Sequence, residues 1–284
     1  MDAMWKKQFA LGLSRACGIG FIDQLEMLKN TGFDGFFVIC DPDVDMLGLA
    51  KKAKELDMRF QSVHAPWDMA AELWHAEDEK AQRGVKKLQT CVDHCVAVQA
   101  PILVVHPFVG FDRHDVTEIG LARYGQVVDY ARQRGIKIAF ENVEGMEFLD
   151  ALMTHFANDD TVGFCWDSGH EMCYNYSQDM LAKYGDRLLC THLNDNLGIK
   201  DFDGKITWLD DLHLLPFDGV ADWKYIAQRL QKCGFTDILT FELNLRSKPG
   251  RHENDPYGQM PYEQYLAMAY ARACRIGKML IDME

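Results

Sequence analysis

Six of the eight apolar, strand-like segments in this sequence end in a residue that binds metals well. Because a strand buried in a sheet is otherwise apolar, a carboxylate or imidazole at the same place in each repeat needs a common explanation. If the strands are parallel, their ends converge, and this mixture of side chains suits hard and borderline divalent metals. The six residues are His64, His106, Glu141, Asp167, His192 and Glu242.

Apolar, β-rich runs alternate with amphipathic stretches along the whole chain. The expected strands are almost continuously apolar, which is typical of parallel strands buried on both faces. Gly32, Gly135 and Gly234 stand where a helix should end before the next strand. Eight such units without a break in composition predict an α/β fold, one (β/α)8 TIM barrel over residues 1–284 as a single domain. The strands are expected at 8–13, 35–40, 59–64, 102–107, 136–141, 162–167, 188–193 and 237–242, and the helices near 19–30, 43–57, 68–98, 115–134, 147–158, 177–184, 221–232 and 260–281.

Composition restricts the compartment and the partners. The formal net charge of −13 repels polyanions, so we expect no nucleic acid partner. The nine cysteines are an odd number and several lie in apolar runs, which indicates small buried hydrophobes in a reducing compartment. No run approaches the ~18 apolar residues of a membrane span, and no signal-like segment follows the N-terminus. The sequence therefore predicts a cytoplasmic protein without a membrane partner.

Four strand ends are candidate metal ligands: Glu141, Asp167, His192 and Glu242. Three carboxylates and one imidazole suit one divalent ion, Mn²⁺, Co²⁺, Mg²⁺ or Zn²⁺, and the residue types do not rank these ions. Taken alone, each residue is equally well explained as a salt-bridged or hydrogen-bonded strand end. The four in register favour a shared ion.

Three histidines are candidate substrate-binding residues beside that ion. His64 and His106 end the third and fourth strands, and a proline within two residues of each breaks the strand and leaves the imidazole at the mouth. His170 stands three residues after Asp167, so a helix that begins after Ser168 would hold it over the site. The alternatives are structural hydrogen bonds for the first two and a helix-capping role for His170.

Two connections, 194–220 and 243–260, are longer than ordinary βα loops, as functional loops are. In the first, Asp211 and His213 would share one face of an extended segment, which predicts a second metal site or a contact with a substrate hydroxyl; the alternative is a solvated turn. The second carries Arg246, a candidate contact for a phosphate or carboxylate of the substrate. The aromatic candidates for stacking on a sugar are Trp67, Trp74, Phe108, Tyr174, Trp208 and Phe217.

No glycine-rich nucleotide loop and no serine-hydrolase elbow occurs, which argues against those enzymes. The ordered motifs instead resemble the xylose-isomerase-like TIM-barrel superfamily over essentially the whole chain. That superfamily contains sugar (phosphate) isomerases and epimerases, inosose dehydratases and isomerases, and type-IV AP endonucleases. The motifs are Val63-His64-Ala65-Pro66, Val105-His106-Pro107, Phe140-Glu141-Asn142, Asp167-Ser168-Gly169-His170, Thr191-His192-Leu193-Asn194-Asp195, Asp211-Leu212-His213 and Phe241-Glu242.

The resemblance implies a metal-dependent isomerase or epimerase of a sugar, sugar phosphate or keto-cyclitol that works by proton transfer through an enediolate. In epimerases of this superfamily the glutamates of strands five and eight are both ligands and acid–base groups, which carries over to Glu141 and Glu242. His170 would orient hydroxyls or shuttle a proton. Loss of a β-hydroxyl would instead give an inosose dehydratase-like lyase. The partner would be a small carbohydrate, and the family is compatible with a homodimer or homotetramer.

A zinc-dependent phosphodiesterase of the AP endonuclease type is the second hypothesis, and a non-catalytic sugar-binding barrel the third. The endonucleases use nine ligands for three zinc ions, and suitable residues occupy all nine matching positions: the six strand ends with His170, Asp211 and His213. Two departures weigh against this hypothesis, namely Ser168-Gly169 in place of Thr-Cys and Leu214–Gly219 in place of a Gly-Glu-Gly run. A DNA-binding mouth should also be basic. The loop after His192 instead carries Asp195, Asp201, Asp203, Asp210, Asp211, Asp218 and Asp222 against Lys200 and Lys205.

Overall fold

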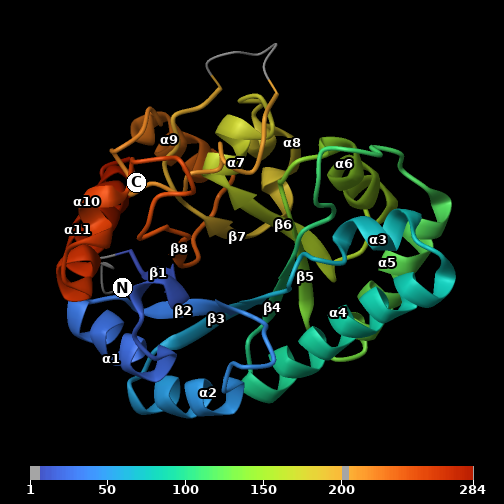
Figure 1. Ribbon diagram of the computed structural model, residues 1–284, viewed down its shortest axis with the longest axis horizontal. Coiled ribbons are helices and arrows are strands. Elements are labelled where there is room, and N and C mark those ends of the chain that lie inside the picture. Colours follow the sequence, from blue (N-terminus) through green and yellow to red (C-terminus); the bar gives the residue numbers. More distant parts are fainter. Residues whose placement is uncertain (1–6, 200–204, 284) are drawn as a thin grey trace.

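Eight parallel strands form a nearly closed ring with helices on its outer side (Figure 1). The computed structural model describes residues 7–199 and 205–283. The strands pair in the order β7-β6-β5-β4-β3-β2-β1-β8, and a parallel bridge between Leu193 and Phe241 joins the two ends of this order. The predicted (β/α)8 TIM barrel is therefore confirmed. The strands are β1 (Phe9–Gly12), β2 (Gly35–Ile39), β3 (Arg59–His64), β4 (Ile102–Val105), β5 (Lys137–Glu141), β6 (Val162–Asp167), β7 (Leu188–His192) and β8 (Leu239–Phe241).

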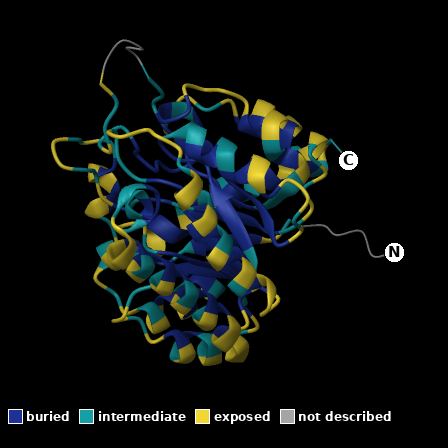
Figure 2. Ribbon diagram, turned by 90° about the vertical axis from the view of Figure 1, so that its right-hand side faces the viewer, coloured by how far each residue is buried: buried dark blue, intermediate teal, exposed yellow. Residues whose placement is uncertain are grey.

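Helices fill the connections between the strands. Figure 2 shows the strands in the buried interior and the outer faces of the helices exposed. Gly32 ends the first helix with a φ of 118°, a left-handed conformation that glycine adopts without strain. The helices are α1 (Phe21–Thr31), α2 (Met46–Glu55), α3 (Ala70–His75), α4 (Asp78–Val98), α5 (Glu118–Arg132), α6 (Met146–His155), α7 (Ser168–Cys173), α8 (Met180–Tyr184), α9 (Trp223–Lys232), α10 (Asp255–Gly258) and α11 (Tyr262–Ile281), with short 3₁₀ turns at Arg15–Cys17 and Gly185–Arg187.

The single helix expected over 68–98 is wrong, because the chain forms two helices there. The break falls at Ala76 and Glu77, whose backbone is extended. Arg123, a buried residue of α5, donates hydrogen bonds to the carbonyl oxygens of Leu73 (2.9 Å) and Ala76 (3.1 Å). These carbonyls lie at the C-terminal end of α3, where no further helical N–H group reaches them. A side chain distant in sequence therefore stabilises the end of α3.

Alternate residues of the strands explain how polar groups reach the mouth of the barrel. Ala139, Cys165 and Cys190 belong to a small apolar cluster separate from the main core, which contains the neighbouring residues Phe140 and Phe164. Successive side chains of a strand point to opposite faces, so the small cluster faces the inside of the ring. Two positions further along the same strands, on the same inner face, stand Glu141, Asp167 and His192.

Five of the nine cysteines are buried and all nine are unpaired, as the sequence predicts for small hydrophobes. Within residues 7–199 and 205–283, no helix is both long enough and apolar enough to cross a membrane.

Candidate metal centre

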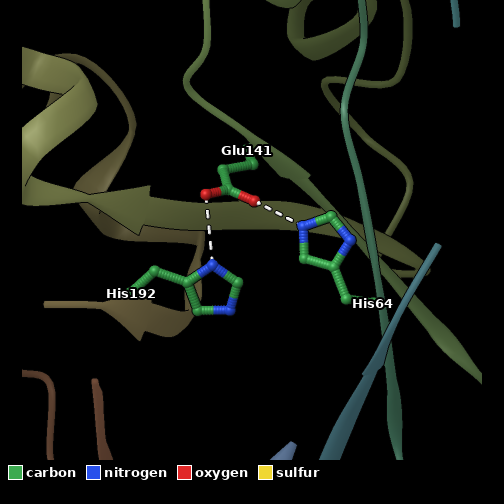
Figure 3. A group of neighbouring side chains, drawn as sticks. All are labelled: His64, Glu141 and His192. Atoms are coloured by element: carbon green, nitrogen blue, oxygen red, sulfur yellow. Dashed lines mark hydrogen bonds and ion pairs between the residues drawn. The ribbon is translucent and has the colours of Figure 1, made fainter. Parts of the chain in front are cut away.

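Glu141, at the end of β5, lies at the centre of a group of histidines from strands β3 and β7, the residue after β4, and helix α7. Its Oε1 is 3.1 Å from His192 Nδ1 of β7, and its Oε2 is 3.2 Å from His64 Nε2 of β3, so the carboxylate is held from two sides (Figure 3). His106 Nε2 lies 3.4 Å from Oε2, and His170 Nδ1 lies 3.4 Å from Oε1. Four imidazoles that the sequence places on four different strands and loops therefore converge on one buried carboxylate.

The four predicted metal ligands lie together. One ligand atom from each of Glu141, Asp167, His192 and Glu242 falls within 4.8 Å of the other three. His192 Nδ1 is also 3.0 Å from Glu242 Oε2. Glu141, Asp167 and His192 are completely buried, whereas the side chain of Glu242 is 23% exposed. Glu242 is thus the member of this quartet that solvent can reach.

Two asparagines that the ligand prediction did not include hold Asp167 in place. Asn142 pairs with the backbone of Asp167 in both directions, through Nδ2 to its carbonyl oxygen and through Oδ1 to its N–H, each at 2.8 Å. Asn194 Nδ2 donates to Asp167 Oδ2 at 2.8 Å. Both asparagines stand within the motifs next to Glu141 and His192, so their position beside predicted ligands was the available signal. Such outer partners orient ligands and fix their protonation.

A second cluster forms around Asp211 and His213. Asp211 Oδ1 lies 2.9 Å from His213 Nε2 and 3.4 Å from His170 Nε2. The expected extended segment is wrong, because His213 has a φ of 47°, in the left-handed region that non-glycine residues rarely adopt. The backbone therefore turns, and the two side chains meet directly. Local strain of this kind is tolerated mostly where function requires a particular side-chain position.

The buried carboxylates and imidazoles of the centre shift one another's pKa values. Burial alone would raise the pKa of Glu141, but His192 and other histidines outweigh it and hold that pKa well below its usual value. Burial would lower the pKa of His192, but Glu141 and Glu242 raise it well above the usual value. At Asp167 burial dominates over the attraction of His170 and raises the pKa to about 6. Glu141 and His192 thus stabilise each other's charged forms.

A divalent cation fits this arrangement of donors. Three carboxylates with one imidazole, brought together in a buried site, are a donor set typical of Mn²⁺, Co²⁺, Mg²⁺ and Zn²⁺ proteins. His192 Nδ1 lies 3.1 Å from Glu141 Oε1 and 3.0 Å from Glu242 Oε2, so it is the imidazole nitrogen that an ion in the quartet would bind. We therefore regard the quartet as able to hold a metal.

A cavity of about 430 Å³, here called the mouth cavity, lies above the quartet. Its wall contains four histidines and one glutamate: His64, His106, His170, His213 and Glu242. Glu141 is not part of this wall. Three of the aromatic residues proposed for sugar stacking are also in its wall, and they are Trp67, Tyr174 and Trp208. The other three lie elsewhere: Trp74 and Phe108 are in the main core, and Phe217 packs against Trp223.

The basic residues after β8 are not free in the cavity to bind a phosphate or carboxylate of a substrate. Arg246 is exposed, although Leu245 before it is buried, and it lines neither the mouth cavity nor the larger cavity beside it. The structure therefore does not bring Arg246 to the site. Lys248 does reach the cavity wall, but its Nζ is 3.0 Å from Asp211 Oδ2. Arg251 is likewise held by Glu253 at 2.7 Å.

The chain belongs to the xylose isomerase-like TIM barrel family, whose model matches residues 25–261. A curated relative, the uncharacterized protein y4fM of Sinorhizobium fredii, is 27% identical and the match covers 78% of this chain and 81% of the relative.

Solved structures with low sequence identity share the fold. The IOLI protein with a bound zinc atom is 17% identical, with a TM-score of 0.73 over 94% of this chain and 98% of that one. An L-ribulose 3-epimerase is 16% identical, with a TM-score of 0.72 over 97% and 95% of the two chains. A xylose isomerase-like TIM barrel/4-hydroxyphenylpyruvate dioxygenase fusion protein gives 0.74 at 14% identity, and this chain spans only 43% of that protein.

Proposed function

We propose that this protein is a metal-dependent isomerase or epimerase of a sugar or keto-cyclitol. The observation that carries the proposal is the quartet of Glu141, Asp167, His192 and Glu242 beneath the mouth cavity, with Glu242 reaching into it. Membership of the family and the likeness to a ribulose epimerase and to a zinc-binding relative support it. A divalent cation held by the quartet would polarise a substrate carbonyl and a neighbouring hydroxyl.

Glu242 is the group best placed to exchange a proton with a substrate. It is the member of the quartet that lines the mouth cavity, and a carboxylate there can remove the proton from the carbon beside a carbonyl. Glu141 lies below the cavity, in contact with His64 and His170, which do line it. A proton exchanged with Glu141 would therefore pass through one of these histidines. Return of the proton to the opposite face gives epimerisation, and return to the adjacent carbon gives isomerisation.

The charges of the cavity favour an unphosphorylated substrate. Lys248, a basic residue in the wall of the mouth cavity, is engaged by Asp211 at 3.0 Å. A phosphate would have to displace this carboxylate, whereas the hydroxyls of a neutral sugar can bind beside it. The aromatic faces of Trp67 and Tyr174 suit the C–H face of a sugar ring. A homodimer or homotetramer and a cytoplasmic location stay predictions.

A zinc-dependent phosphodiesterase is the second candidate, and one observation favours it. His170, Asp211 and His213 form a cluster next to the quartet, so all nine residues of ligand type lie at the mouth. The paired state of Lys248 and the net charge of −13 weigh against a DNA substrate. Of the acidic loop, Lys200, Asp201 and Asp203 lie outside the described residues.

Solvent exchange tests the proposed chemistry without knowledge of the product. Mn²⁺-loaded protein is incubated in D₂O with a panel of ketoses, keto-inositols and glycosides of keto-sugars, and NMR follows the carbon-bound protons. We expect deuterium to enter at the carbon beside the carbonyl in at least one compound, because proton removal by Glu242 exposes the site to solvent exchange. The metal-free protein is the control. Absence of exchange in the whole panel, with metal bound, would contradict the proposal.

A further inference from the structure

A second cavity of about 610 Å³ adjoins the mouth cavity, and the two share Trp67 and Glu242 in their walls. This side cavity lies over the ends of β1, β2, β3 and β8. Each cavity alone falls within the ~300–1,000 Å³ typical of a site for a whole small molecule. A single monosaccharide over the quartet would therefore leave the side cavity unfilled. The apolar part of its wall is formed by Leu13, Phe21, Phe37, Ile39, Trp67 and Leu243.

Phe37 connects the side cavity to the candidate metal centre. Its ring stacks on His192, with centroids 4.6 Å apart and planes inclined by 15°. Gly12 permits this position, because a Cβ at that residue would lie 2.6 Å from the Phe37 ring. Trp67 forms the other part of the boundary and stacks on His106 at 5.5 Å. A group in the side cavity would thus lie against the residues that surround the quartet.

The charged side chains in the wall of the side cavity are already paired. Arg15 Nη2 is 3.1 Å from Asp41 Oδ1, and Lys87 Nζ is 2.6 Å from Asp68 Oδ1. The fifth charged residue, Glu242, contacts His192 at 3.0 Å. The Arg15–Asp41 and Lys87–Asp68 pairs are exposed to solvent, with each side chain at least 40% accessible, and the wall beside them is apolar. This apolar wall suits a neutral group with apolar surface.

We propose that the substrate is a glycoside whose sugar ring carries a ketone, with that reacting ring over the quartet and a neutral, largely apolar aglycone in the side cavity. This inference rests on the proposed function only in placing the sugar end at the metal centre. Glu242 and Trp67 lie between the two parts, so the glycosidic link would pass beside them. Burial of an aryl group against these apolar side chains contributes affinity that a free sugar lacks.

Binding of matched glycosides tests this inference. The full chain loaded with Mn²⁺ is titrated calorimetrically with pairs of methyl and 4-nitrophenyl D-hexosides, each pair sharing one sugar and one anomeric configuration. These compounds carry no ketone, so they report binding without reaction. We expect the nitrophenyl compound to bind on the order of tenfold tighter or more in at least one pair, which is a discounted estimate for burying an aryl ring. Equal binding, or no binding, in every pair would overturn the inference.

Two variants locate the effect. Ile39→Trp fills the side cavity and should abolish the preference for the nitrophenyl compound while leaving the affinity of the methyl compound and the metal content unchanged. Phe21→Ala removes part of the apolar wall and should reduce the preference. This second variant keeps the test decisive if Ile39→Trp fails to fold. Ile22→Trp, on the exposed side of α1, is the matched control and should change neither affinity. A preference that survives both cavity variants would contradict the inference.

The binding test and the exchange test fail separately. Exchange of free ketoses without any aglycone preference would remove the glycoside inference and leave the proposed function intact. An aglycone preference that depends on Ile39, without exchange in any sugar, would keep the side cavity as a ligand site and remove the isomerase proposal.

Discussion

Glutamine in place of Glu242 is expected to lower kcat at least ~10³-fold, within the range observed for loss of an acid–base group. The substitution keeps the shape of the side chain but removes its charge and its ability to accept a proton. It also weakens the contact with His192 Nδ1, now 3.0 Å away, and removes one donor from the quartet. Steady-state kinetics on the substrate found by solvent exchange, with the metal content measured in the same sample, give the comparison.

Glu141→Gln should have an effect of the same order for a different reason. Glu141 is completely buried and contacts four histidines, so a neutral amide removes the carboxylate that His64 contacts and one of the two that His192 contacts. Metal affinity should therefore fall more than in the Glu242 variant. Glu263→Gln, the same change on the exposed side of α11, is the control and should leave kcat unchanged. Near-normal turnover of either active-site variant with metal bound would refute the mechanism.

Removal of the metal is expected to abolish activity, and addition of Mn²⁺ or Co²⁺ to restore it. Without a metal, Lys248 in the cavity wall stays engaged by Asp211, so the negative charge that develops on a carbonyl oxygen when the adjacent proton leaves is poorly stabilised. The protein is treated with EDTA, the chelator is removed by dialysis, and activity is followed as each ion is added back. Circular dichroism before and after treatment separates loss of metal from loss of fold. Full activity in a preparation shown to be metal-free would contradict this prediction.

The architecture of the barrel follows from features that are local in sequence. Each strand is a short apolar run, and parallel strands place their last residues at one end of the ring. From this rule alone, the sequence predicts that the four candidate ligands lie close together, as they do: Glu141, Asp167, His192 and Glu242. The period of two along each strand then decides which side chains face inward.

The features that could not be predicted depend on contacts between distant segments. The break between α3 and α4 is stabilised by Arg123, a residue of a later helix. The turn at His213 needs a left-handed backbone that no glycine or asparagine in the sequence indicates. Arg246 is exposed after a bend of the chain at residues 245–246, which the sequence does not mark. In each case the local pattern is compatible with two conformations, and tertiary contacts select one.

Metal content per chain, measured by elemental mass spectrometry on protein purified without chelator, tests the central claim most directly. A site formed by the quartet predicts about one Mn, Co, Mg or Zn ion per chain, and loss of that ion in Asp167→Asn, which removes a carboxylate from the quartet. Close to three zinc ions per chain would contradict a single-metal isomerase and would favour a zinc-dependent phosphodiesterase that acts on abasic DNA. No metal after reconstitution would contradict a metal-dependent enzyme of either kind.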